Sequence, residues 1–192
     1  MPEHISEIEE NLLMEARTGD RNAYGELAGR CYSDVIRVVY RACGDTALAQ
    51  DAVQEAFIRA WVKLPEFQAR APFSHWVCRI AVNVALDTLR EKPQESIEDN
   101  PTMTHLAGKN LDPETAYVAR EQADRVQNAI KSLPEAARTV LVFREYGQMS
   151  YDEIAATLEI PVGTVMSRLN YARSKLRELL LEECMETERE YA

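Results

Sequence analysis

Apolar residues recur at helical spacing along most of this chain, and no run alternates apolar and polar residues as a half-buried strand does. In the first half this pattern predicts four helices, over about residues 6–18, 20–43, 47–64 and 73–91. Ser6 and Glu9 have the spacing of a capping box at the first helix start. Glycine-aspartate pairs end the first two helices, and a proline ends the third. The chain is therefore predicted to be all-α.

Each of these helices has one apolar stripe that is expected to face inward. In chain order the stripes consist of Ile8, Leu12, Leu13 and Ala16; Tyr24, Leu27, Cys31, Val35, Val38, Val39 and Ala42; Val53, Phe57, Ala60, Trp61 and Leu64; and Trp76, Ile80 and Val84, with Leu89 as a further candidate. Four stripes that bury one another make one helical domain. The opposite face of the third helix carries Asp51, Gln54, Glu55 and Arg59 and is expected to be exposed.

A stretch without apolar periodicity comes next, rich in proline and in acidic and amide residues. At ~3.3 to 3.6 Å per residue it spans ~70 Å when extended, which is hard to place inside one compact domain. We therefore expect a flexible acidic linker between two domains. The predicted organisation is a first domain over residues 6–92, a linker over 93–112 and a second domain over 113–185.

The second domain is predicted to contain four helices, the last two short and sharply bounded. Ser150 and Glu153 form a second capping box, which opens a helix that ends near Glu159. After a Pro-Val-Gly turn a basic helix begins at Thr164, a good N-cap residue, and its inward residues are Val165, Leu169, Ala172, Leu176 and Leu179. Two helices joined by a tight, glycine-containing turn are typical of a helix-turn-helix.

The charge is strongly negative overall but unevenly distributed. The 192 residues include 22 Lys and Arg against 32 Asp and Glu, a formal net charge of −10. Residues 161–181, in contrast, hold four cations and one acid. A local surface that binds nucleic acid is therefore compatible with the composition. The acidic start of the chain and the lack of a ~20-residue apolar run predict a cytoplasmic protein without a membrane span.

Residues suited to catalysis or metal binding do not gather in any familiar pattern. The three histidines are scattered, no Glu-x-x-His occurs, and there is no phosphate-binding glycine loop. We expect no enzyme activity, no catalytic residues, no metal and no cofactor. The cysteines have no zinc-ligand spacing. Two interpretations of Cys31, Cys43, Cys78 and Cys184 stay open: free buried thiols or a redox switch.

Two motif sets resemble the extracytoplasmic-function (ECF) group of the sigma-70 family, bacterial RNA polymerase sigma factors. Residues 51–61 (DAVQEAFIRAW) and 73–83 (FSHWVCRIAVN) are similar to sigma region 2. Leu133-Pro134, Arg144-Glu145 and the segment from Ser150 to Leu176 are similar to region 4. The order of the two sets and the gap between them also match. The resemblance implies a factor that directs core RNA polymerase to promoters with −10 and −35 elements.

In region 2 the resemblance implies two binding surfaces. By this resemblance, Asp51, Gln54 and Glu55 are the residues expected to bind the clamp of the polymerase β′ subunit. The loop before the fourth helix and that helix are expected to bind unpaired bases of the −10 element. The residues implied are Phe67, Trp76, Arg79, Ile80, Asn83 and Asp87. Asn83 is the best candidate for a hydrogen bond to a base, and an exocyclic amine suits the carboxylate of Asp87. Trp76 and Ile80 are equally compatible with plain core positions.

In region 4 the basic helix is expected to recognise the −35 element as duplex DNA. The residues implied are Thr164, Met166, Ser167, Arg168, Asn170, Tyr171, Arg173 and Lys175. Met166 occupies a position where many relatives have arginine, which favours apolar contact with a thymine methyl over a guanine contact. Arg144 is expected to bind a phosphate, or else to form an ion pair with Glu145 or Glu153.

The resemblance also implies partners. They are core RNA polymerase, through its β′ clamp and β flap, promoter DNA, and an anti-sigma factor that covers the core-binding surfaces. The acidic linker is implied to enter the polymerase, or has no function of its own. One alternative stays open, a stand-alone helix-turn-helix regulator whose first domain senses a ligand or dimerises. Such a regulator has no need of the Asp51, Gln54 and Glu55 set.

Overall fold

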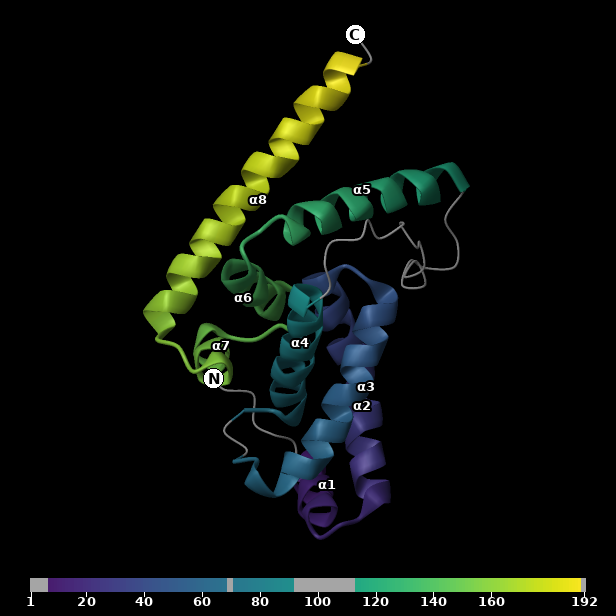
Figure 1. The fold of residues 1–192 in the computed structure, drawn as a ribbon, viewed down its shortest axis with the longest axis vertical. Coiled ribbons are helices and arrows are strands. Elements are labelled where there is room, and N and C mark those ends of the chain that lie inside the picture. The colour runs from purple at the N-terminus through teal and green to yellow at the C-terminus, as the bar shows by residue number, and fades with distance from the viewer. Residues whose placement is uncertain (1–6, 69–70, 92–112, 191–192) are drawn as a thin grey trace.

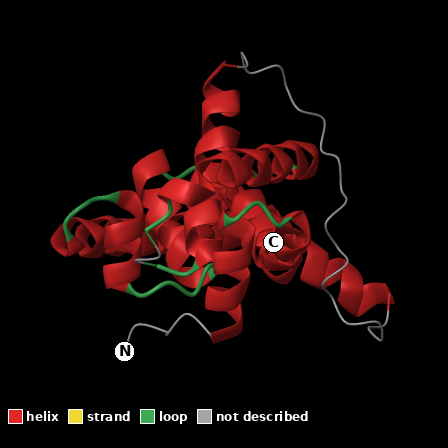
Figure 2. Ribbon diagram, turned by 90° about the horizontal axis from the view of Figure 1, so that it is seen from below, coloured by secondary structure: helices red, strands yellow, loops and turns green. Residues whose placement is uncertain are grey.

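The fold is seen in a computed structural model, which describes residues 7–68, 71–91 and 113–190, with side chains over 119–181 in the last part. The described residues form helices and connecting loops without any strand, in agreement with the predicted all-α class (Figure 2). The elements are α1 Glu7–Arg17, α2 Arg21–Cys43, α3 Thr46–Lys63, the 3₁₀ turn η1 Leu64–Glu66, α4 Phe73–Glu91, α5 Pro113–Lys131, α6 Glu135–Glu145, α7 Tyr151–Leu158 and α8 Val162–Glu190.

The boundaries of α2 and α3 are set by local capping chemistry. The Asp20 carboxylate accepts hydrogen bonds from two backbone N–H groups at the start of α2. Gly44, at φ 71°, ends α2 in the left-handed conformation that glycine adopts without strain. Asp45 then caps α3. Of the capping box expected at the chain start, Ser6 lies outside the described residues, while the Glu9 carboxylate accepts a 2.8 Å hydrogen bond from the backbone N–H of Phe73.

Helices α1 to α4 pack into the predicted four-helix unit, with α2, α3 and α4 side by side (Figure 1). Its centre consists of small and medium residues such as Val35, Val39 and Ala56, which are fully buried. The buried face of α4 differs from the predicted inward stripe. Trp76, Ile80 and Val84 are only partly buried at the edge of the core, whereas the deeply buried face is Phe73, Val77, Cys78, Ala81, Val82, Ala85 and Leu86. Alanines and valines fit there because α4 packs against both α2 and α3.

Helices α7 and α8 form the predicted helix-turn-helix, and both contact α6. The capping box of Ser150 and Glu153 is present in full, with both reciprocal hydrogen bonds. Glu159 ends α7 in the left-handed region. The last helix begins at Val162 and not at the predicted Thr164, because the Pro161 carbonyl already accepts the N–H of Thr164 and completes a first turn. Beyond its contacts with α5, α6 and α7, α8 extends away from the rest of the chain (Figure 1).

The two helical units also pack against each other, which the sequence patterns did not predict. Helix α2 contacts α5 and α6, and α4 contacts α7. Buried Gln127 exchanges two hydrogen bonds with Arg41, at 3.1 and 3.3 Å. Arg37 donates to the carbonyl of Tyr146 at 3.1 Å, and Arg90 pairs with Glu135. The predicted linker lies outside the described residues.

Candidate polymerase and nucleic-acid interfaces

The first turns of α8 present a polar and apolar mixture to solvent. Val165, Leu169 and Ala172 anchor the helix on α6 and α7. Of the predicted DNA-binding residues, Met166, Ser167, Asn170, Tyr171 and Arg173 are exposed, and Thr164, Arg168 and Lys175 are partly exposed. From Val162 to Arg177 the helix contains four cations and no acid. The structure thus brings all eight predicted residues to one helix and leaves most of them accessible.

Some of the cations near this helix already have partners. Arg173 pairs with Glu145 at 2.8 Å, and this hydrogen bond raises the pKa of Arg173 above its ordinary value. Arg144 donates to the carbonyl of Met149 at 2.8 Å and lies over the ring of Tyr151. The carboxylates suggested as ion-pair partners for Arg144 are engaged elsewhere, Glu145 with Arg173 and Glu153 in its capping box. Arg144 therefore stabilises the connection between α6 and α7.

An aromatic cluster closes the end of the first unit near η1. Phe67, predicted to capture a base, is buried, with 7% of its surface exposed. Its ring stacks on Trp76, with centroids 4.6 Å apart and planes at 26°. Phe73 meets both rings at about 6 Å. In this arrangement Phe67 and Phe73 serve as core, and Trp76, half-buried, is the member nearest to solvent.

The outer face of α4 carries the other residues predicted for the −10 element. Asn83 is exposed, and exposed Asp87 pairs with Arg90 at 2.7 Å. Ile80 is half-buried against the core. Arg79 donates to Glu159 in the turn between α7 and α8, at 2.7 Å, and this contact lowers the pKa of Glu159. Glu159 of the second unit therefore pairs with Arg79, a cation of the surface that was predicted to bind single-stranded DNA.

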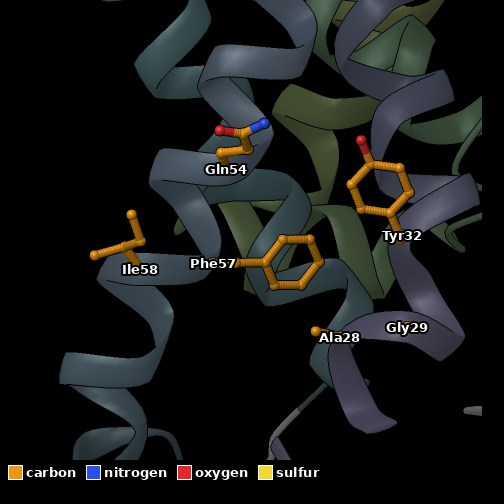
Figure 3. A pocket seen from close by; sticks show the side chains of 6 residues that line it. All are labelled: Ala28, Gly29, Tyr32, Gln54, Phe57 and Ile58. Atoms are coloured by element: carbon orange, nitrogen blue, oxygen red, sulfur yellow. The ribbon is translucent and has the colours of Figure 1, made fainter. Parts of the chain in front are cut away.

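The predicted core-binding residues lie on α3 beside a groove. Asp51 and Gln54 are exposed, and partly exposed Glu55 pairs with Arg59 at 2.8 Å. Gln54 also lines an apolar groove of about 430 Å³ between α2 and α3, whose other lining residues are Ala28, Gly29, Tyr32, Phe57 and Ile58 (Figure 3). The Phe57 ring points from α3 toward α2, where Tyr32 lies nearly parallel to it with centroids 6.3 Å apart.

Sequence reasoning missed the apolar part of this surface. Tyr32, Ile58 and Val62 are exposed by 41, 61 and 71%. They are large apolar residues that fall outside the inward stripes of their helices, and this mismatch was the available signal. Together with Gln54 they give α3 and α2 one continuous face that suits a partner helix.

The described cysteines are buried thiols. Burial raises the pKa of Cys31 to about 12 and that of Cys43 to about 11, and it also raises the pKa of Cys78. Thiolate is the reactive form, so these environments disfavour oxidation. Within the described ranges no group of three or more potential ligand side chains could hold a metal ion. In that same part of the chain no helix is long and apolar enough to cross a bilayer.

Comparison with known proteins decides what this arrangement is. Residues 27–93 match sigma-70 region 2, and residues 123–176 match sigma-70 region 4. The ECF RNA polymerase sigma factor SigW of Bacillus subtilis is 32% identical over 176 residues, which are 88% of this chain and 94% of SigW. This chain belongs to the ECF sigma factors. The ECF sigma-E factor of Escherichia coli is 35% identical over 175 residues, 86% of this sigma factor and 90% of the relative.

Solved structures agree with the fold of this sigma factor. The structure of CnrH in complex with the cytosolic domain of CnrY has a TM-score of 0.69 and 26% identity, and it covers 91% of this chain and 97% of that one. The sigma factor RpoE of Bartonella quintana, in complex with the anti-sigma factor NepR, has a TM-score of 0.63 at 21% identity and supports the fold alone. The region 2 match covers α2 from Leu27 onward, α3 and α4, and the region 4 match covers the end of α5, α6, α7 and the first half of α8.

Proposed function

We propose that this sigma factor binds core RNA polymerase through α2 and α3 of region 2 and directs it to promoters through α4 and α8. The observation that carries the proposal is the pairing of two surfaces on one chain. One is the groove beside Gln54, which suits a protein helix, and the other is the acid-free face of the second helix of a helix-turn-helix, which suits duplex DNA. Initiation is a cytoplasmic task, and the sigma factor supplies specificity to it without catalysing a reaction.

Core binding is assigned to the face of α3 that carries Asp51, Gln54 and Glu55, together with the groove next to it. The occupant proposed is the helical clamp of the β′ subunit. Exposed Ile58 provides apolar area, and the polar residues around it provide orientation, as in other interfaces with an apolar centre and a polar rim. The second polymerase contact, with the β flap, is assigned to region 4.

Recognition of the −10 element is assigned to the outer face of α4. Asn83, exposed and amide-bearing, is the residue proposed to bond a base, and Asp87 is proposed to accept from an exocyclic amine. Trp76 offers a partly exposed ring for stacking. Arg79 serves a phosphate in this proposal, which requires it first to leave Glu159. Promoter binding therefore involves exchange of the Glu159 carboxylate for a phosphate at the Arg79 guanidinium.

Recognition of the −35 element is assigned to α8. Ser167 and Asn170 are exposed hydrogen-bonding groups that we propose to face the major groove, with Arg168 and Tyr171 beside them. Arg173 and Lys175 lie further along the helix and serve the phosphate backbone. The ion pair with Glu145 orients the guanidinium of Arg173 but leaves it accessible, because both side chains are almost half exposed.

An anti-sigma factor is proposed as the regulatory partner. The CnrH and RpoE structures named above were solved with CnrY and with the anti-sigma factor NepR. In this sigma factor the groove between α2 and α3 is the surface that such a partner and the polymerase would compete for. A partner helix that filled it would cover Gln54 and exclude the β′ clamp.

The proposal is tested by the affinity of the purified protein for core polymerase. Replacing Glu55 by Lys removes the Arg59 ion pair and reverses the charge at that position of the docking face, and we expect core affinity to fall about tenfold or more. Glu121→Lys is the matched control, since Glu121 also pairs four residues along its helix, with Arg125, and is similarly exposed. Equal core affinity for both variants contradicts the docking assignment. Specific duplex binding without any core binding favours a stand-alone regulator.

A further inference from the structure

Three exposed apolar side chains gather at the start of α8. Among the described residues nine large apolar side chains are exposed, and three of these lie within the first ten residues of this helix. They are Val162, Met166 and Tyr171, exposed by 36, 49 and 51%. A single exposed apolar residue such as Tyr171, which projects from another side of the helix, needs no explanation, whereas Val162 and Met166 adjoin each other and mark a contact surface.

Val162 and Met166 form one ridge of the helix. They are four residues apart, so their side chains lie one above the other on the same face. The buried anchors Val165 and Leu169 are three and seven residues from Val162, so the ridge borders the anchored side of α8 while its own side chains stay exposed. The ridge occupies the first two turns of α8, the part of a recognition helix that comes closest to base edges in the major groove.

The surroundings of the ridge specify its occupant. Arg168 and Arg173 come within two further turns, and no acid occurs before Glu178. An apolar protein partner has no need of such a cationic border, whereas duplex DNA presents phosphates on both sides of its groove. Inside the major groove the prominent apolar group on a base edge is the C5-methyl of thymine. The occupant that fits both features is a thymine-containing duplex.

We propose that Val162 and Met166 contact thymine methyl groups, and that this contact selects thymine in the −35 element of this sigma factor. The inference rests on the proposed function, since it assigns base chemistry to the helix that is proposed to bind the −35 element. Met166 contributes the larger part of the apolar contact with the methyl groups, because it is the longer and more exposed side chain and lies in the second turn. Val162 supports it from the first turn.

The experiment compares thymine with deoxyuridine, which differs only by that methyl group. Holoenzyme assembled from this protein and its core polymerase is used to enrich −35 duplexes from a library randomised at that element. Each thymine of the enriched duplex is then replaced singly by deoxyuridine, and holoenzyme affinity is measured. Burial of one methyl group corresponds to about fourfold in affinity, from ~0.8 kcal/mol. We expect a loss of about that size at one or two positions.

Variants identify the side chain responsible. Met166→Ala is expected to abolish discrimination at one of these positions, and Met166→Leu is expected to keep it. The matched control is Met14→Ala, which removes an exposed methionine from α1, 65% exposed and outside the helix-turn-helix. Unchanged discrimination in Met166→Ala, or no loss at any position in the original protein, overturns the inference and leaves the proposed function standing. Failure to form holoenzyme or to enrich any duplex contradicts the proposed function instead.

Discussion

The packing of region 4 on region 2 can be tested at Gln127. Its side chain, 5% exposed, accepts a hydrogen bond from the Arg41 guanidinium and donates one to the Arg41 carbonyl. Both of these Arg41 groups belong to α2, whereas Gln127 belongs to α5, so the two hydrogen bonds exist only while α5 lies on α2. Gln127→Ala removes both hydrogen bonds and leaves the partly buried Arg41 without this partner.

The expected cost is about 1 to 3 kcal/mol of unfolding free energy, from two hydrogen bonds at ~0.5 to 1.5 kcal/mol each. In a chain of this size each kcal/mol lowers the melting temperature by about 2 to 4 °C. Asn128→Ala is the control, because Asn128 is the next residue of α5 and is exposed. Its expected effect is within about 0.5 kcal/mol.

Urea unfolding of the full chain, monitored by circular dichroism, measures both variants. A double-mutant cycle with Arg41→Ala adds a direct test of contact, since residues that touch show coupling whereas distant residues have additive effects. If Gln127→Ala costs no more than Asn128→Ala, or if the cycle is additive, α5 does not lie on α2 in solution and the packing of the two regions is refuted.

Three further predictions concern local structure. Ser150→Ala should destabilise the chain by about 0.5 to 2 kcal/mol in urea unfolding, because it removes the N-cap of α7. Burial alone would raise the pKa of Glu153, but hydrogen bonds from Ser150 and the charge of a nearby histidine outweigh it and lower this pKa. Its stabilising effect is therefore complete above the ordinary carboxyl pKa and lost as the pH falls through the lower folded value, so the Ser150→Ala difference should shrink in acid titrations of stability. Gly44→Ala should cost about 1 to 2 kcal/mol, because φ is 71° and a Cβ atom would lie 2.1 Å from the Lys131 side chain, whereas Gly25→Ala, with open space around it, should be neutral or stabilising by the same assay.

Much of the fold could be predicted from local patterns. The capping box at Ser150, the left-handed glycine at Gly44 and the apolar period of α2 are short-range signals, and the structure confirms each of them. The start of α8 was misplaced because Thr164 is a good N-cap residue by type. Pro161, however, supplies a fixed φ and an acceptor carbonyl, which let the helix begin earlier.

Other features depend on contacts between distant residues and leave no local pattern. Apolar spacing suggested that Trp76, Ile80 and Val84 form the inward face of α4, but a helix between two neighbours needs small residues such as Ala81 at its centre. The Arg79–Glu159 ion pair joins residues 80 positions apart, and both residue types are common on solvated surfaces. The groove beside Gln54 depends in the same way on how α2 and α3 are placed, so only its polar residues were predicted.

The most direct test of the sigma-factor role is transcription by purified components. Core polymerase is supplied with genomic fragments, with and without this protein, and the 5′ ends of the transcripts are mapped. We expect a discrete set of starts that requires the protein and shares two upstream elements, and we expect Glu55→Lys to lose these starts while Glu121→Lys keeps them. Transcripts that are identical with and without the protein, despite correct folding and duplex binding, would contradict its role as a sigma factor.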